Sequence, residues 1–183
     1  MTGSAPRGYA YVGPAGPLAL VRPGAEGSPV RGRDDLAAWL ALREPAEREE
    51  PFTFVVGLDG VLRLVPRRGE HVVCAGGERI LAAGEITLGW RRDGWQAVEV
   101  SNQSTGYCPD PDCWPAVADA LDRAGIARPD RLRTPFVFRR CPECGERNLV
   151  KDGFFVCAFC DADLPAAWNL DGPGGGYGNR PGG

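Results

Sequence analysis

Two pairs of alternating apolar and polar segments occupy the middle of the chain. The first pair, FTFVVG from Phe52 and VLRLV from Val61, is separated by a Leu-Asp-Gly turn at residues 58–60. The second pair, EITLGW and WQAVEVS, is joined through residues 91–94, which end in Asp-Gly. Alternation with a period of two is typical of β-strands, and Asp-Gly favours a tight turn. The pattern therefore predicts two antiparallel β-hairpins.

Two other segments carry apolar residues at helical spacing. Residues 34–42 begin with two aspartates and predict a short amphipathic helix, because acidic groups stabilise a first helical turn. Residues 114–124 predict a second helix, and Gly125 follows where a helix commonly ends. The first thirty residues place glycine and proline around two apolar runs, near Tyr11 and at 18–21, which predict short strands. The charged stretch 43–50 predicts a solvated connector.

These elements, together with four cysteines arranged as two CxxC pairs at residues 141–160, predict the α+β fold class: a small antiparallel β-rich domain with two short helices, followed by a zinc-ribbon hairpin. We find no internal repeat. The expected parts are a flexible N-terminus at 1–8, the α+β domain at 9–127, a linker at 128–135, a zinc ribbon at 136–168 and a disordered Gly/Pro-rich tail at 169–183.

Composition narrows the classes of protein to which the chain could belong. With 183 residues, 43% hydrophobic and 25% charged, it has the mixture of a globular protein large enough to bury a core. No window is long and apolar enough for a membrane helix, and the N-terminal residues lack the features of a signal peptide. We therefore expect a cytoplasmic location and no membrane partner. The net charge of −3 provides no general attraction for nucleic acid.

Four of the seven cysteines form two CxxC pairs twelve residues apart, in CPECGERNLVKDGFFVCAFC at residues 141–160. Two such turns facing each other supply the tetrahedral ligands that zinc prefers. Gly145 can adopt the left-handed backbone conformation that a metal-binding turn needs. We expect strands at 148–150 and 154–156 with a turn between them. The ligands of one structural zinc ion are then Cys141, Cys144, Cys157 and Cys160.

Disulfides and a redox CxxC are the alternatives to zinc. A reducing compartment and an odd number of cysteines disfavour a fully paired disulfide framework. A redox motif needs a single CxxC at a junction between a strand and a helix, not two flanking a hairpin. Because thiolates would fill all four positions, the metal is expected to be structural, not catalytic.

A second zinc site is conceivable among the remaining cysteines and the single histidine. Its ligands would be His71, Cys74, Cys108 and Cys113. The simpler interpretation is that these cysteines are small buried apolar residues, as the string around Cys74 indicates. A cysteine nucleophile activated by His71 is a third possibility.

The middle of the chain, from about Phe54 to Gly125, also resembles a known module. The residues that carry the resemblance are His71, AGG at 75–77, AAGE at 82–85 and SNQSTGYCP at 101–109. They are similar to the His/AGE/SGHY-type module of plant IQ-calmodulin-binding-motif proteins and bacterial polymorphic-toxin-type proteins. Two valines stand where that module has serines, and TGY at 105–107 replaces its GHY.

The resemblance implies a β-rich fold in which four residues lie near a common cleft, namely His71, Glu85, Ser104 and Tyr107. In such a cleft Glu85 could orient His71 as a base, and Ser104 and Tyr107 could donate to a ligand. The alternative is that polar residues such as Asn102 and Ser104 only satisfy the backbone of an irregular loop.

Three functions remain open at this point. The first is an intracellular zinc-ribbon protein that acts as a protein-binding or adaptor module, with a protein partner and no catalytic activity. The second is an effector- or transferase-like enzyme that uses the cleft around His71. The third is a nucleic-acid-binding ribbon, which would need Arg139, Arg140, Arg147 and Lys151 on one face. The ribbon's five carboxylates against four basic residues favour a protein partner over nucleic acid.

Overall fold

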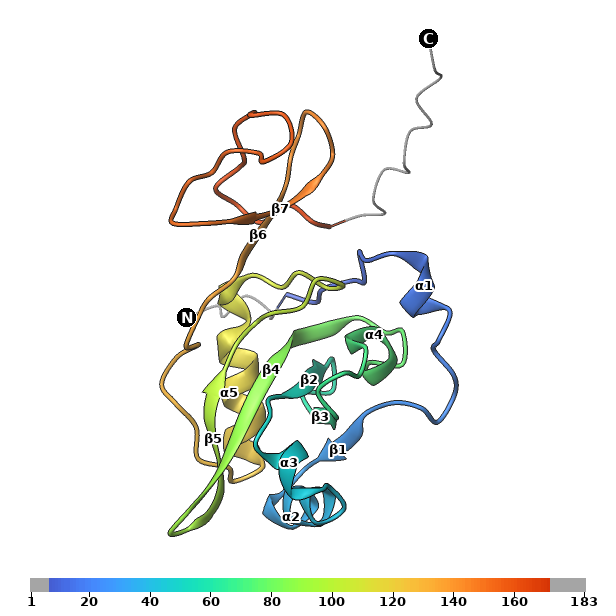
Figure 1. The fold of residues 1–183 in the computed structure, drawn as a ribbon, viewed down its shortest axis with the longest axis vertical. Helices are drawn as coiled ribbons and strands as arrows, with labels where there is room; N and C mark the ends of the chain where they lie inside the picture. The colour runs from blue at the N-terminus through green and yellow to red at the C-terminus, as the bar shows by residue number, and fades with distance from the viewer. Residues whose placement is uncertain (1–6, 172–183) are drawn as a thin grey trace.

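A five-stranded antiparallel sheet forms the centre of the molecule (Figure 1). The computed structural model describes residues 7–171. The strands lie in the order β1-β3-β2-β4-β5. Their bounds are Ser28–Val30 for β1, Phe52–Gly57 for β2, Leu62–Val65 for β3, Ile80–Arg91 for β4 and Gly94–Val100 for β5.

Both predicted hairpins are confirmed. In the β2–β3 turn Gly60 has φ +72°, a left-handed conformation that glycine adopts without a steric penalty, and Asp59 Oδ1 accepts the N–H of Val61 at 3.0 Å. The β4–β5 hairpin closes at the Arg91–Gly94 pair. Strand β4 begins five residues before the predicted segment, since residues 80–84 continue the pairing with β2.

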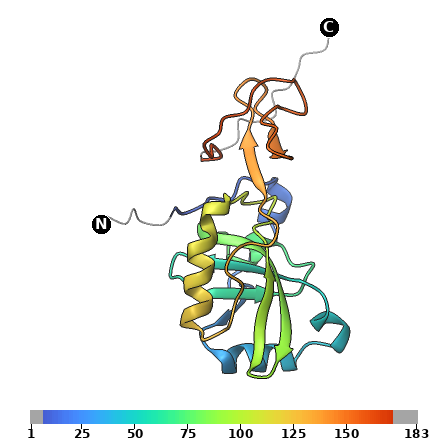
Figure 2. The same cartoon turned by 90° about the vertical axis from the view of Figure 1, so that its left-hand side faces the viewer.

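Helices cover the sheet. The two predicted helices are α2 (Arg33–Ala41) and α5 (Trp114–Arg123), and α5 lies along the sheet (Figure 2). Leu121 of α5 and Leu36 of α2 are buried in the main core. Three single-turn helices, α1 (Ala15–Leu18), α3 (Pro45–Arg48) and α4 (His71–Cys74), and a 3₁₀ turn η1 (Pro111–Cys113) complete the set. The α+β class is therefore confirmed. Among the described residues no helix is long and apolar enough to cross a bilayer.

The predicted strands in the first thirty residues are wrong in most of their extent. Of the predicted strand 18–21, Leu18 ends helix α1 and residues 19–21 are in neither a helix nor a strand. Near Tyr11 only Tyr9 pairs, in an isolated bridge to Ile80. The prolines of this segment lack the N–H group that a strand ladder requires, which explains the difference. The predicted connector 43–50 contains the short helix α3.

The ribbon is a separate lobe beyond one end of the sheet in both views (Figures 1 and 2). Its strands are β6 (Val137–Arg140) and β7 (Arg147–Val150). The predicted pairing of 148–150 with 154–156 is wrong, because β7 pairs with β6 instead. Residues 154–156 make only isolated bridges, Lys151 to Phe154 and Val156 to Asp163.

The predicted boundaries of linker and tail also differ from the structure. In the linker 128–135 the side chain of Leu132 is buried, and the N–H of Arg133 bonds to the Val100 carbonyl at 3.0 Å. Leu170 is completely buried, and Asn169 bonds to the backbone of Arg140. The fold therefore extends beyond residue 168. The predicted flexible N-terminus and tail otherwise fall at 1–6 and 172–183, outside the described residues.

Candidate metal centre

The four cysteines of the two CxxC pairs come together in the ribbon, although they are up to nineteen residues apart. Their Sγ atoms all lie within 4.8 Å of one another. The Sγ atoms of Cys141 and Cys160 are 3.5 Å apart, and those of Cys144 and Cys157 are 3.6 Å apart. A disulfide needs about 2.0 Å, whereas a tetrahedral zinc ion with Zn–S bonds of about 2.3 Å places its ligands about 3.8 Å apart. The geometry fits a four-thiolate metal site.

The two metal-binding turns have the same backbone design. Gly145 has φ +76° and its N–H bonds to the Cys141 carbonyl at 3.0 Å. Asp161 has φ +60° and its N–H bonds to the Cys157 carbonyl at 3.1 Å. The predicted left-handed turn at Gly145 is confirmed, and the second turn uses an aspartate for the same purpose.

Asn148 holds the two turns together and was not singled out in the sequence. Its Nδ2 donates to the Glu146 carbonyl at 3.0 Å and to Cys157 Sγ at 3.5 Å. Its Oδ1 accepts the N–H of Ala158 at 2.9 Å. A polar residue at an inward strand position was the available signal, because a buried amide needs several partners. Asn148 thus fixes the position of one sulfur relative to both turns.

Electrostatics favour ionised sulfur at Cys157. Burial opposes the charge, but the backbone N–H groups of Phe159 and Cys160 and the Asn148 amide point at the sulfur and lower the pKa of the Cys157 thiol to about 6. A metal ion requires deprotonated thiols, and the same N–H groups would stabilise the Cys157 thiolate as a ligand.

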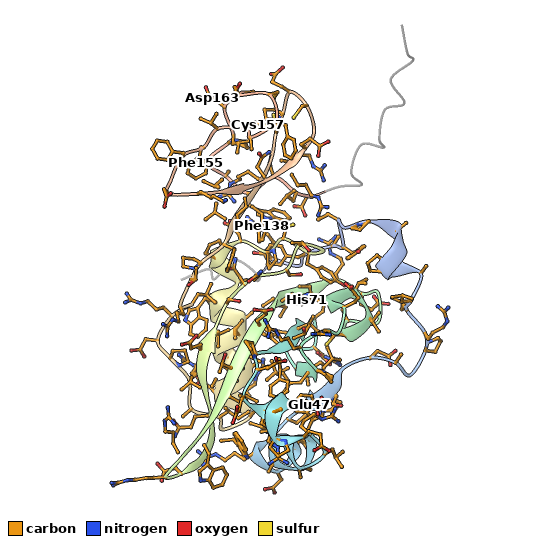
Figure 3. All side chains as sticks on the ribbon, in the orientation of Figure 1. Glu47, His71, Phe138, Phe155, Cys157 and Asp163 are labelled. Carbon is orange, nitrogen blue, oxygen red and sulfur yellow. The ribbon has the colours of Figure 1, made fainter. Side chains whose placement is uncertain are left out.

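The second metal site is not formed. Among the described residues the only group of three or more potential ligands close enough for one ion is the ribbon cluster. His71 Nε2 lies 3.0 Å from the Gly84 carbonyl oxygen, Cys74 Sγ donates to the Arg63 carbonyl, and Cys108 Sγ donates to the Thr105 carbonyl. Each group is thus satisfied by a different segment of backbone. Figure 3 shows His71 in the sheet domain, well away from Cys157.

The free cysteines of the core lack the features of a nucleophile. Cys74 and Cys113 are buried, and burial raises the pKa of each thiol to about 12. Burial also raises the pKa of Cys108, although the nearby Arg147 acts in the opposite direction. A reactive cysteine needs an accessible thiolate. The interpretation of these residues as small buried apolar groups is the one that the structure supports.

The structure does not bring the four candidates for a catalytic cleft into one pocket. The Tyr107 hydroxyl donates to the Glu78 carbonyl at 2.7 Å, and Ser104 Oγ accepts the N–H of Tyr107 at 3.3 Å. Both side chains are buried and serve the backbone. Burial lowers the pKa of His71, so its ring is neutral near pH 7.

Glu85 lies apart from these residues, at a cleft of about 200 Å³ on the sheet beside the segment 133–136. Its polar neighbours there include Glu99, Ser101 and Gln103, and Arg133 forms an ion pair with Glu99. The sequence pattern had not grouped these residues, because the cleft is formed only when the predicted linker packs on the sheet.

The loop 101–111 follows strand β5 in the sheet domain, and its polar side chains bind the ribbon. Asn102 is completely buried: its Nδ2 donates to the carbonyl oxygens of Pro109 and Phe136 at 2.9 and 2.7 Å, and its Oδ1 accepts the Phe136 N–H at 2.8 Å. Asp110, from the same loop, forms an ion pair of 2.8 Å with the buried Arg139. The polar residues of this loop therefore anchor the ribbon.

Apolar packing completes the joint. Cys108, Phe138 and Leu170 form a small buried cluster between the two lobes, and Phe138 is labelled at this position in Figure 3. Trp168 lies at its edge, where its Nε1–H donates to the Cys108 carbonyl at 2.8 Å and its ring meets Tyr9 edge-on at 5.1 Å. The residues that pack the ribbon on the sheet domain therefore come from segments before and after the predicted linker in the sequence.

Comparisons of the chain with protein-family models, with curated proteins and with solved structures find no match. The similarity to the plant and bacterial module therefore stays a prediction from the sequence.

Proposed function

We propose that this chain is a protein-binding or adaptor module whose binding surface is a ribbon held by one structural zinc ion. The metal part of the proposal rests on the four converging sulfur atoms. A tetrahedral set of four thiolates suits zinc and leaves no open position for water or substrate. The ion would therefore shape the ribbon and take no part in a reaction.

The observation that carries the binding part is the set of apolar side chains on the outside of the ribbon. Phe154 is 73% exposed, Phe159 65% and Val156 47%. Between them Phe155 turns inward, so the outward positions alternate with inward ones. Isolated exposed apolar residues are ordinary, but three within six residues on a small lobe are typical of a protein contact.

The rival functions have less support. The enzyme interpretation relied on four residues in one cleft, and three of them are engaged with backbone groups elsewhere. The nucleic-acid interpretation needed four basic side chains on one face. Among the ribbon's basic residues at 136–168 only Lys151 is exposed, because Arg139 is buried and Arg140 and Arg147 are half-buried. Within the described ribbon these four basic residues therefore do not form the exposed basic face that phosphate groups would need.

The test uses the full chain and a synthetic probe. A fluorescein-labelled amphipathic peptide of about 18 residues, with leucines on one helical face and glutamines on the other, is titrated with protein while its anisotropy is followed. We expect saturable binding that a zinc chelator abolishes. Phe154→Ser combined with Phe159→Ser should abolish binding as well.

The matched control is Leu42→Ser, which removes a 76% exposed apolar side chain from the other lobe. It should leave binding unchanged, and all variants should keep about one equivalent of zinc by elemental analysis. Binding that survives the double ribbon change, or that Leu42→Ser weakens equally, would show that the ribbon is not the binding surface.

A further inference from the structure

The basic and acidic side chains of the ribbon are separated along its length. We define the ribbon tip as residues 141–146 and 151–163. The first range holds one metal-binding turn, and the second range holds the other turn together with the segment that connects it to β7. Every carboxylate of the ribbon lies in this tip and is exposed, while three of its four basic residues lie outside it. The acidic residues of the tip are Glu143, Glu146, Asp152, Asp161 and Asp163.

Two of the three arginines are committed to the side of the ribbon that meets the sheet domain. Arg139 pairs with Asp110, and Arg147 donates to the Thr105 carbonyl at 2.5 Å. Arg140 donates to the Gly145 carbonyl at 3.0 Å and is half-buried. The charges of Arg139 and Arg147 are therefore held beside the sheet domain, whereas Arg140 lies at the edge of the tip, bound to its backbone.

The tip consequently carries a strong negative charge. Its five carboxylates and the single ammonium of Lys151 give a formal charge of −4. Four thiolates and the divalent ion that they hold have a net charge of about −2, and part of this negative charge is at the exposed Cys144 and Cys160. Within the described residues none of the five carboxylates takes part in a salt bridge of the chain itself.

The carboxylates of the tip are close neighbours of its exposed apolar residues along the chain or across a bridge. Asp152 is two residues before Phe154, and Asp161 is two residues after Phe159. Val156 is bridged directly to Asp163. An occupant that covers the phenylalanines must therefore also meet negative charge, which costs free energy unless the occupant supplies cations.

We infer that the occupant of the ribbon tip is a basic amphipathic segment of a partner protein, with apolar side chains for the phenylalanines and Lys or Arg for the carboxylates. This inference rests on the proposed binding function and names the chemistry of the partner. The same charge excludes acidic segments, which the tip would repel.

The test compares three fluorescein-labelled peptides that share one leucine face and carry lysine, glutamine or glutamate on the polar face. At about 0.05 M salt the lysine peptide should bind about tenfold or more tightly than the glutamine peptide, and the glutamate peptide most weakly. At about 0.5 M salt the difference between the lysine and glutamine peptides should shrink, because screening weakens exposed charges.

A triple variant, Asp152→Asn, Asp161→Asn and Asp163→Asn, should bring the affinity of the lysine peptide down toward that of the glutamine peptide. The control carries the same change of charge on the sheet domain, at the exposed residues Asp34, Asp119 and Asp130. It should keep the preference. Both triple variants should retain zinc, which separates a charge effect from loss of the ribbon.

Each outcome separates this inference from the proposed function. Equal binding of the lysine and glutamine peptides, abolished by the double phenylalanine change, would overturn the inference and leave the binding function standing. An equal effect of both triple variants would also overturn it, because the attraction would then come from the net charge of the whole chain. Absence of binding by all three peptides would overturn both.

Discussion

Replacing Asn102 by alanine tests whether loop 101–111 anchors the ribbon. The side chain of Asn102 is completely buried and makes three hydrogen bonds, two to Phe136 at the entry of the ribbon and one to Pro109 in its own loop. Asn102→Ala removes a donor and an acceptor together. It leaves the Pro109 carbonyl oxygen without this partner in a buried place, and the N–H and carbonyl oxygen of Phe136 without it in a half-buried one.

The magnitude follows from these three groups. A buried polar group that loses its partner costs about 1–3 kcal/mol. Two of the three groups belong to the half-buried Phe136 and cost the least, so the free energy of unfolding should fall by about 3–5 kcal/mol. A domain of this size has about 5–15 kcal/mol in total, and each kcal/mol corresponds to about 2–4 °C in melting temperature. We therefore expect the melting temperature to fall by about 6–20 °C.

Urea unfolding and thermal melting of the zinc-loaded protein measure this change. Gln103→Ala is the matched control, since Gln103 is the exposed neighbour of Asn102 and should change stability by less than about 0.5 kcal/mol. Asn102→Asp keeps the acceptor but turns a carboxylate toward two carbonyl oxygens, so it should be destabilising as well. If Asn102→Ala matched Gln103→Ala, the anchoring role of the loop would be refuted.

Three further changes probe the metal, the ion pair and the histidine. Cys141→Ser should reduce bound zinc from about one equivalent to none by elemental analysis, whereas Cys74→Ala should retain it; a full equivalent in the first variant would contradict the site. Asp110→Ala should lower the free energy of unfolding by about 3 kcal/mol in urea, because the Arg139 guanidinium stays buried without its counter-ion; a loss below about 0.5 kcal/mol would count against this pair. Burial lowers the pKa of His71 below 6.5 in the folded protein, so the unfolded chain takes up this proton first as the pH falls. Neutral His71 therefore favours the folded state in full above pH 6.5, and this part of the free energy of unfolding decreases as the pH falls below that value. The fall in stability between pH 7 and 5 should therefore be smaller in His71→Gln than in the unchanged protein, and identical slopes would show that His71 does not titrate in this window.

Local sequence patterns determined the elements that depend on neighbouring residues. Alternation and Asp-Gly turns predicted both hairpins, and apolar spacing predicted helices α2 and α5, because side-chain periodicity is a property of a single segment. The CxxC spacing predicted the metal cluster for the same reason, since a metal-binding turn is formed by consecutive residues.

Tertiary structure decided which segments meet. Strand β7 pairs with β6, which precedes the first metal-binding turn, and not with residues 154–156, which follow β7. The sequence had placed all of these residues in the ribbon without showing which of them pair. His71 and Glu85 were expected in one cleft. Instead His71 bonds to the Gly84 carbonyl, and Glu85 faces the segment 133–136. A residue fourteen positions away along the chain can lie on either face of a sheet, and the linear pattern does not record which one.

The role of loop 101–111 illustrates the same division. Its polar composition predicted an irregular loop that satisfies its own backbone, and Ser104 does so. The sequence by itself did not show that Asn102 and Asp110 would bind residues of the ribbon 34 and 29 positions away. Such hydrogen bonds and ion pairs are strong only where packing excludes water, and that burial exists only once the whole chain has folded.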